Sequence, residues 1–328
     1  MNHSSEVIKK FREAIERFSL IQKGDRIAIA LSGGPDSVVL THLLLRIAPE
    51  YRLKLFAVHV DHRLRGKISE KEAEWVRVFS KKAGIRCRLY RLRGLAGGTK
   101  NLQEAARQQR YDRLVKGAVA FRATKIATAH HADDQLETVV MRFLQGAGLE
   151  GLAGIPIIRH HPIPIIRPIL FLTKEELFTY ARENRLHYCV DRSNRDPKYW
   201  RNRLRLKLIP ALKKEAPTLA REVGRLAAAL RTDADCFLDQ TESLYKKLVR
   251  RKKGERLFSR PSFLKIHPAL QIRLLKKALT ELGGGTRGIA HHLQKMLELI
   301  RSPDGRALYS LPGRRLFEKK DKSIRISV

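Results

Sequence analysis

The sequence predicts a doubly wound α/β domain, with helices on both faces of a parallel sheet, followed by a basic and mainly helical domain. Two observations lead to this prediction. Short apolar runs alternate with longer amphipathic ones across residues 26–147, which is the pattern of successive strand–helix–strand units. Beyond Lys213–Pro217 the amphipathic segments are charged and mostly succeed one another without an apolar strand-like run between them. We therefore expect one domain over residues 1–215 and a second over residues 216–328.

The apolar runs predict four strands, and the amphipathic segments predict the helices between and after them. The strands are expected at Arg26–Leu31, Leu53–Val60, Arg86–Arg91 and Lys125–Ala129. The helices are expected at Ser37–Ala48, Ser69–Ala83, Asn101–Phe121 and Asp133–Leu144. In sheets of this kind ligands bind at the carboxyl ends of the strands. The residues just after Leu31, Val60 and Ala129 are therefore candidates for a binding site.

The next part of the chain is interrupted by prolines. Ile155–Ile169 contains four of them and is too broken for an interior strand or helix. Thr173 and Glu176 form a capping-box pattern, which predicts a helix that runs to about Asn184. A basic helix is expected around Trp200–Leu208.

We expect Pro210 to end that basic helix, which follows a polar loop at Asp191–Tyr199. The C-terminal domain is then predicted to contain three helices and three short strands. The helices are expected near Thr218–Arg250, His267–Leu282 and Ile289–Ile300, and the strands at Arg306–Leu311, Leu316–Lys319 and Ile324–Val328.

The charge of the chain predicts a polyanionic partner. Lys and Arg number 67 against 33 Asp and Glu, a formal net charge of +34. From Ala216 to the end there are 25 basic and 11 acidic residues, and the first 215 residues contain 42 basic and 22 acidic ones. An excess of one sign in both parts favours nucleic acid, whose phosphates give a salt-sensitive affinity.

Composition also excludes several classes of protein. The cysteines are Cys87, Cys189 and Cys236, without CxxC spacing, which argues against a disulfide scaffold, a thiolate zinc finger and a cysteine-ligated iron–sulfur site. No apolar run approaches the ~20 residues of a membrane span, and the first ten residues lack the apolar centre of a secretory signal. We expect a cytoplasmic protein with no membrane partner.

The sharpest local signal is the hexapeptide Ser32–Ser37 (SGGPDS), which joins the first strand to its helix. Gly33 and Gly34 have no side chains, so that backbone N–H groups can approach a pyrophosphate closely. Pro35 suits the first helical turn, and the helix N-terminus favours an anion. The Gly-Lys-Ser/Thr ending of a Walker A loop is missing.

The other side chains of the hexapeptide support a nucleotide site. Ser32 and Ser37 can donate hydroxyl hydrogen bonds to phosphate oxygens. Asp36 would repel phosphate unless it binds Mg²⁺ or caps the helix. The alternative is an ordinary tight turn with a serine or aspartate cap.

A second constellation, His130–Glu137 (HHADDQLE), follows the fourth strand and opens a helix. Asp134 and Glu137 are three residues apart and share a helix face. The alternative is that Asp133 and Asp134 cap the helix and complement its dipole, while the histidines only end a strand. A catalytic zinc is not expected, because no third ligand at a suitable spacing accompanies the histidines.

Further motifs in the same order resemble one family. The hexapeptide is the signature of the PP-loop ATP pyrophosphatases, with their adenine nucleotide hydrolase-like sheet, and the whole set resembles the tRNA(Ile)-lysidine synthetases over roughly residues 24–211. The matching segments are VHVDHRLR (Val58–Arg65), NLQEAARQQRYD (Asn101–Asp112), HHADDQLETVVMRFLQGAGLEGLAGI (His130–Ile155), RPIL (Arg167–Leu170) and DRSNRDPKYWRNRLRLKLIP (Asp191–Pro210).

The resemblance implies an ATP-dependent ligase. It would join free L-lysine to carbon-2 of the wobble cytidine in the CAU anticodon of tRNA(Ile), through an adenylated tRNA, with release of AMP and pyrophosphate. ATP and Mg²⁺ are the implied cofactors, and a homodimer is allowed. The implied ATP-binding residues are Ser32, Gly33, Gly34, Pro35, Asp36, Ser37, Asp61 and His131, with Asp36 also on Mg²⁺; Asp61, however, equally suits a strand-end cap.

The resemblance also assigns roles beyond ATP. Asp36, Asp134, Glu137 and Arg110 are the implied catalytic residues, with Asp134 and Glu137 on the lysine amines and Arg110 on an anion. Arg201, Asn202 and Arg205 would contact phosphates of ATP or tRNA, unless they form a solvated basic face. Tyr199 and Trp200 suit either a stacked base or, more often, core packing.

Other functions fit the sequence less well. tRNA-thiolating enzymes of the superfamily generally need cysteines that this chain lacks, often as CxxC. Amidotransferase-type synthetases have no use for the large positive charge and call for a glutaminase region. A non-catalytic RNA-binding protein would not need an intact SGGPDS and HHADDQLET.

Overall fold

The computed structural model describes residues 3–61, 67–92, 102–189, 200–284 and 288–328. It divides into two compact units, Met1–Arg231 and Thr232–Val328. The division falls inside helix α10 (Leu219–Leu248), beyond the boundary that we expected at residue 215. The reason is packing: Ala220, in the first turn of α10, is buried with Ile209 and Leu136 in a small cluster of the first unit.

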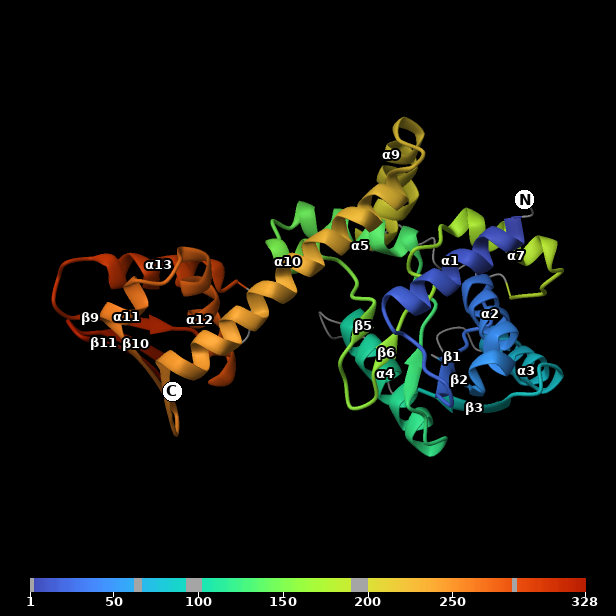
Figure 1. The fold of residues 1–328 in the computed structure, drawn as a ribbon, viewed down its shortest axis with the longest axis horizontal. Coiled ribbons are helices and arrows are strands. Elements are labelled where there is room, and N and C mark those ends of the chain that lie inside the picture. Colours follow the sequence, from blue (N-terminus) through green and yellow to red (C-terminus); the bar gives the residue numbers. More distant parts are fainter. Residues whose placement is uncertain (1–2, 62–66, 93–101, 190–199, 285–287) are drawn as a thin grey trace. The chain divides into compact units, whose positions relative to one another are not determined.

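The first unit contains the predicted doubly wound sheet (Figure 1), in which six strands follow the order β3-β2-β1-β4-β6-β5. All neighbours pair in parallel except the last two. The strands are β1 (Arg26–Ala30), β2 (Lys54–Asp61), β3 (Arg86–Arg91), β4 (Lys125–Ala127), β5 (Ile158–Arg159) and β6 (Ile165–Ile166). The predicted fold class is confirmed.

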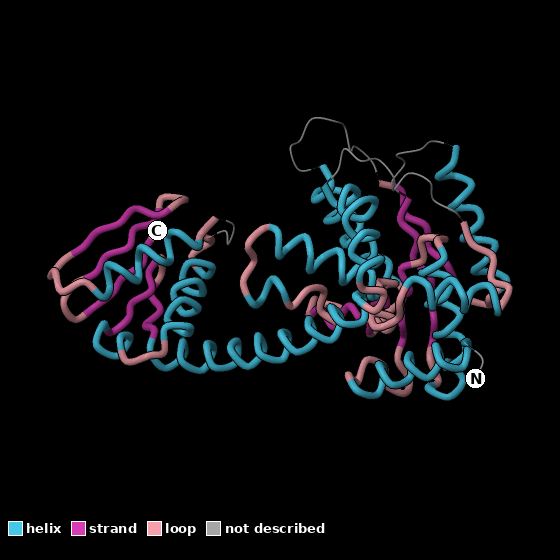
Figure 2. Tube along the Cα trace, turned by 90° about the horizontal axis from the view of Figure 1, so that it is seen from above, coloured by secondary structure: helices cyan, strands magenta, loops and turns pink. Residues whose placement is uncertain are grey.

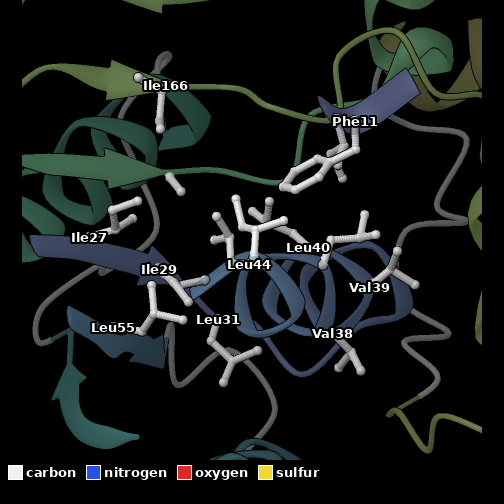
Figure 3. Close-up of a cluster of buried hydrophobic side chains, with 14 of the residues drawn as sticks. Phe11, Ile27, Ile29, Leu31, Val38, Val39, Leu40, Leu44, Leu55 and Ile166 are labelled. Carbon is white, nitrogen blue, oxygen red and sulfur yellow. The ribbon is translucent and has the colours of Figure 1, made fainter. Parts of the chain in front are cut away.

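Helices cover both faces of this sheet. Those that pack on it are α1 (His3–Arg17), α2 (Pro35–Tyr51), α3 (Lys67–Lys82), α4 (Leu102–Ala120) and α7 (Lys174–Glu183), while α5 (Ala132–Leu144) and α6 (Leu149–Leu152) follow β4 along the chain. Because side chains alternate along a strand, Ile27 and Ile29 of β1 pack with α2, whereas Ala28 packs with α4. Figure 3 shows the larger of the two layers, in which Leu40 and Leu44 of α2 point toward Phe11 of α1.

The proline-rich stretch contributes to the sheet, so the expectation that it is too broken for a strand was wrong. β6 lies between β4 and β5. The backbone N–H groups of Ile126 and Thr128 donate to the carbonyls of Pro164 and Ile166, at 2.9 and 3.0 Å. A proline cannot donate a backbone hydrogen bond, but its carbonyl can accept one. Acceptance is what β4 needs here, because the Ile126 N–H is the donor.

The helix that the sequence predicts after Thr173 is confirmed. The Thr173 hydroxyl accepts a hydrogen bond from the Glu176 N–H, and the Glu176 carboxylate accepts one from the Thr173 N–H. This reciprocal pair is the predicted capping box.

The basic helix does not end at Pro210, contrary to expectation. It begins as α8 (Trp200–Arg203), widens into the π-helical turn η2 (Leu204–Leu208) and continues as α9 (Ile209–Glu215). Pro210, which has no backbone N–H to donate, directly follows the wider π-helical turn, and the helix continues past it. Trp200 is 42% exposed, so the expected core packing of this side chain was wrong; Tyr199 lies outside the described residues.

The second unit is an α+β unit in which an antiparallel sheet of order β7-β8-β11-β10-β9 packs against helices (Figure 2). Its elements are β7 (Val249–Lys252), β8 (Glu255–Ser259), α11 (Arg260–Leu264), α12 (Pro268–Glu281), α13 (Ala290–Arg301), β9 (Ala307–Leu311), β10 (Arg315–Lys319) and β11 (Ser323–Ser327). The three last strands were predicted. The β7–β8 hairpin was not, because three of the four β7 side chains are exposed and basic, which hides the apolar alternation.

Across the described ranges, no helix is both long and apolar enough to span a membrane.

Candidate functional site

The candidate site lies at the carboxyl edge of the parallel sheet in the first unit. Ser32–Ser37 follows β1, Asp61 ends β2, and the turn to His131 follows β4. Since β1 pairs in parallel with both β2 and β4, the three segments come together at one edge. The predicted placement of the site is thus what the topology produces.

The hexapeptide loop is shaped by its glycines. Gly33 has φ +91°, a conformation that side-chain-bearing residues rarely adopt, and a Cβ there would lie 3.3 Å from Val76 Cγ2. Its carbonyl accepts a hydrogen bond from the Cys189 N–H at 2.9 Å. Gly34 is the N-cap of α2 with no capping side chain, and Pro35 follows in the first turn. The helix therefore begins with backbone N–H groups that no side chain covers.

The loop hydroxyls hold one another in place. Ser32 Oγ lies 3.1 Å from Ser37 Oγ, and Ser37 Oγ donates to the Gly34 carbonyl at 2.9 Å. The Ser32 hydroxyl also accepts from the Gly34 N–H at 3.3 Å. Both hydroxyls are thus oriented within the loop before any ligand is present.

Asp36 is not used as a helix cap. Its Oδ1 atom is buried and has no hydrogen-bond partner among the described residues. Burial raises the pKa of this carboxyl, His131 opposes that effect and Asp134 adds to it. An orphaned buried carboxylate oxygen beside a phosphate-type loop fits Mg²⁺, which proteins usually hold with one or two carboxylates together with substrate phosphates. Asp36 is therefore the residue that would hold the ion.

His131 connects the two constellations. Its Nε2 atom lies 3.7 Å from Asp36 Oδ2 and 3.5 Å from Asp134 Oδ2, and its Nδ1 atom lies 3.7 Å from Asp133 Oδ2. Burial opposes the charged imidazolium, but the three carboxylates outweigh it and raise the pKa of His131. The loop after β1 and the start of α5 are thereby joined electrostatically.

Asp133 and Asp134 serve different purposes. The Asp134 carboxylate accepts a hydrogen bond from the His131 N–H at 3.2 Å, so it does cap α5, while it also faces the site. Asp133 points the other way and accepts from the Lys174 N–H at 2.7 Å and from Lys213 Nζ. Burial would raise the pKa of Asp133, but His131, Lys213 and the Lys174 N–H lower it strongly. Asp133 therefore ties α7 and α9 to the start of α5.

Glu137 is paired with the basic helix. The Arg205 guanidinium donates to both Glu137 oxygens, at 2.6 and 2.9 Å, and Arg201 Nε donates to Oε2 at 3.1 Å. The same arginines lie 3.5 and 3.9 Å from Asp134 Oδ1. The acidic pair that the sequence suggests for lysine is therefore bound by the two arginines suggested for phosphate.

Arg110 lies on another side of the site. It is half-buried on α4, with its guanidinium carbon 5.7 Å from the centre of the Tyr111 ring. Burial lowers the pKa of Arg110, and the positive charges of Arg107 and Arg201 lower it further, whereas Tyr111 raises it. His130 lies nearby, and burial with Arg167, Arg107 and Arg110 lowers its pKa to about 3 even though Asp134 opposes them. His130 is therefore neutral.

Two further predicted residues are placed without a defined role. Asp61 is buried at the end of β2, and its carbonyl accepts a hydrogen bond from the Leu92 N–H. Asn202 is half-buried on α8. The sequence analysis assigned no role to Lys213 or Arg167. Lys213 has no characteristic spacing from other residues of the site. Arg167 belongs to the segment RPIL, whose residue types do not by themselves indicate a chemical function.

In the described part of the chain, no three histidine, cysteine or acidic side chains are grouped so that they could hold a metal ion by themselves.

Comparison with known proteins identifies the class and then the family. A family model described as a PP-loop domain matches residues 3–212, so the first unit is a PP-loop domain. The tRNA(Ile)-lysidine synthase of Clostridioides difficile (strain 630) is 31% identical over 97% of this chain and 70% of its own length. The tRNA(Ile)-lysidine synthase of Symbiobacterium thermophilum is 33% identical over 93% of this chain and 66% of its own length. The chain belongs to the tRNA(Ile)-lysidine synthase family, which confirms the resemblance of the motifs.

Two further comparisons bear on extent and fold. The relative from Geobacillus kaustophilus (strain HTA426) is 33% identical over 85% of this chain, which covers 61% of that protein; the chain thus spans roughly two thirds of the length of its curated relatives. The solved structure of the U34-tRNA thiolase NcsA from Methanococcus maripaludis has a TM-score of 0.59 at 20% identity, covering 70% of this chain and 78% of that one. This likeness shows the fold alone.

The Asp133 anchor predicts a pH-dependent contribution to stability. The folded pKa of Asp133 lies below its ordinary value of 3.8, so its stabilisation is fully present above that value and is lost as the pH falls toward the folded pKa. Asp133→Asn should lower the free energy of unfolding at pH 7 by about 1–3 kcal/mol, as loss of a buried charged acceptor does. The difference should shrink below about pH 4.

The measurement is urea denaturation of both proteins between pH 3.5 and 7. Asp112→Asn is the matched control, because Asp112 is exposed and accepts a hydrogen bond from Gln108 on its own helix. A constant difference between wild type and Asp133→Asn across the range would contradict the assignment.

Proposed function

We propose that this protein forms lysidine: it ligates free L-lysine to carbon-2 of the wobble cytidine in the CAU anticodon of tRNA(Ile), at the expense of ATP. The observation that carries the proposal is the position of His131, within 3.7 Å of Asp36 in the phosphate-type loop and 3.5 Å of Asp134 beside Glu137. The loop proposed to bind the nucleotide and the carboxylates proposed to bind the amines would thus share one small site. The names of the curated relatives support the same reaction.

The first half-reaction activates the base. The carbon-2 oxygen of cytidine attacks the α-phosphorus of ATP, and pyrophosphate leaves with the electrons of the broken P–O bond. The backbone N–H groups at the α2 N-terminus, which no capping side chain covers, would bind the pyrophosphate. Asp36 would hold Mg²⁺, which neutralises charge on the phosphates. The carbon-2 oxygen is thereby converted into an adenylate, a good leaving group.

The second half-reaction uses the acidic pair. The ε-amine of lysine attacks carbon-2, AMP leaves with the former carbonyl oxygen, and the amine loses a proton. Asp134 and Glu137 are the side chains proposed to hold the amino groups, and Arg110 the carboxylate. Burial would raise the pKa of Asp134, but His131 and Arg201 outweigh it and lower the pKa below its ordinary value, so this carboxyl is ionised and suited to bind an ammonium group.

The proposal is tested by incubating the protein with tRNA(Ile), ATP and lysine and analysing the anticodon nucleosides by mass spectrometry. Lysidine should appear only when all three substrates are present, with AMP and pyrophosphate formed in equal amounts. A protein that binds tRNA but releases no pyrophosphate would be a binding protein, and the proposal would be rejected. The reaction would place the protein in the cytoplasm, where its substrates are.

The role of Asp36 is tested by Asp36→Asn. Asparagine keeps the size of the side chain and removes the charge that would hold Mg²⁺. Formation of adenylated tRNA should slow by at least about 10²-fold, typical of the loss of one electrostatic contact to a transition state. Glu50→Gln is the control on the same helix, since Glu50 pairs with Arg12 at the surface. A near-normal rate in Asp36→Asn would show that this carboxylate is dispensable for activation.

The role of the acidic pair is tested by Asp134→Asn and Glu137→Gln. Each should block mainly the second half-reaction, so that adenylated tRNA forms and then persists in the presence of lysine. The assay is a single turnover with α-labelled ATP, with and without lysine, on variants whose melting temperatures show that the Arg201–Arg205 contacts have not been lost. If neither variant forms the adenylate, these carboxylates serve ATP or the metal, and the assignment to lysine fails.

A further inference from the structure

Four arginines surround one buried tyrosine beside the proposed active site. We call this set, Arg107, Arg110, Arg159 and Arg167 around Tyr111, the arginine–tyrosine cluster. The guanidinium carbons of Arg107, Arg110 and Arg159 lie 5.2, 5.7 and 5.6 Å from the centre of the Tyr111 ring. The Arg107 guanidinium also lies 3.4 Å from the Tyr111 hydroxyl.

Arg167 forms the buried end of the cluster. It is only 2% exposed, directly follows β6, and donates to the Pro156 carbonyl at 2.5 Å. Its Nε atom is buried without a hydrogen-bond partner among the described residues. Burial lowers the pKa of Arg167, Tyr111 opposes this, and Arg107 and Arg159 lower it further.

The cluster has an unbalanced positive charge. Within the described residues, no carboxylate forms an ion pair with any of the four guanidinium groups, whereas Arg201 and Arg205 are both paired with Glu137. Stacking on the ring of Tyr111 stabilises cations, but it does not neutralise them. Four clustered guanidinium groups, one of them buried, therefore form a site suited to a strong anion.

The position of the cluster identifies where that anion would belong. Arg167 directly follows β6, which pairs in parallel with β4, and His130 follows β4. Arg167 therefore lies at the same edge of the sheet as His130 and the start of α5, which carries Asp134. Arg107 and Arg159 are exposed, so that the site opens from the surface inward to Arg167.

We propose that the arginine–tyrosine cluster binds a backbone phosphodiester of the RNA substrate, next to the nucleotide that reacts, and that Arg107, Arg159 and Arg167 thereby position that nucleotide. This inference rests on the proposed function. Phosphate geometry matches planar guanidinium groups, and the exposed side chains of Arg107 and Arg159 are accessible to a polymer at the surface. The ATP phosphates already have the loop after β1, and a single amino acid carboxylate needs no more than one arginine such as Arg110.

The test is the double substitution Arg107→Gln and Arg159→Gln. Both side chains are exposed, so the variant should fold, which its melting temperature checks; Arg167 is left intact because it is buried. The control is Arg88→Gln, since Arg88 is likewise exposed and stacks on a tyrosine, Tyr90, at 5.7 Å, but lies on β3 and is not part of the arginine–tyrosine cluster. The ligand is a transcript of the anticodon stem-loop, titrated at several salt concentrations without ATP or lysine.

We expect the double variant to bind the stem-loop about tenfold or more weakly, with the slope of log K against log salt reduced by about one to two. Arg88→Gln should change neither, and the KM values for ATP and lysine should stay within about twofold of the wild type. An unchanged salt slope would overturn the inference. So would a defect confined to the KM of lysine or of ATP, because the cluster would then bind a carboxylate or the nucleotide.

This measurement separates the inference from the proposed function. The stem-loop titration measures binding without catalysis. If the wild-type protein binds the stem-loop but makes no lysidine, the proposed function is rejected, and the salt slope of the double variant still decides whether the cluster binds phosphate. A wild-type protein that makes lysidine, with an unchanged slope in the variant, would reject only the phosphate site.

Discussion

The start of α5 concentrates negative charge, and the need to compensate that charge organises much of the first unit. Four carboxylates gather there, those of Asp36, Asp133, Asp134 and Glu137. Buried carboxylates are costly unless cations and hydrogen bonds balance them. The cations come from far along the chain: Arg201 and Arg205 reach Glu137 across 64 and 68 residues, and Lys213 reaches Asp133 across 80. These contacts hold the helical segment 200–215 against α5.

The same site separates two kinds of charge. His131 lies among the acidic residues at the start of α5, whereas Arg110 and its neighbours gather around Tyr111. In a chain with a net charge of +34, acidic groups are outnumbered, and a cationic ligand beside Asp134 and Glu137 would share these carboxylates with Arg201 and Arg205. The arginines around Tyr111 favour anions. A substrate set that combines amine, carboxylate and phosphate groups needs both environments within one site.

How much of this was predictable depends on whether a feature is local. The strands, the loop SGGPDS and the start of α5 follow from local periodicity and from the rule that parallel strands end at a common edge, so the meeting of Asp36 with Asp134 could be anticipated. The pairing of Arg205 with Glu137 could not, because nothing in either segment specifies a partner 68 residues away. β6 was missed because prolines suggest a broken strand, although the Pro164 carbonyl beside it needs only to accept a hydrogen bond from β4. β7 was missed because its exposed basic side chains hide the apolar alternation that marks a strand.

The pairing also constrains how the proposed roles can operate together. Arg205 uses two guanidinium donors on Glu137, and Arg201 uses one; donors committed in this way are not available to a phosphate at the same time. Conversely, a lysine ammonium group near Asp134 and Glu137 adds positive charge where two guanidinium groups already balance two carboxylates. If both roles hold, a phosphate that binds the remaining guanidinium N–H groups offsets the positive charge of the two arginines before or as lysine binds. The phosphate and lysine sites are then linked through these two side chains, because each ligand relieves the charge that excludes the other.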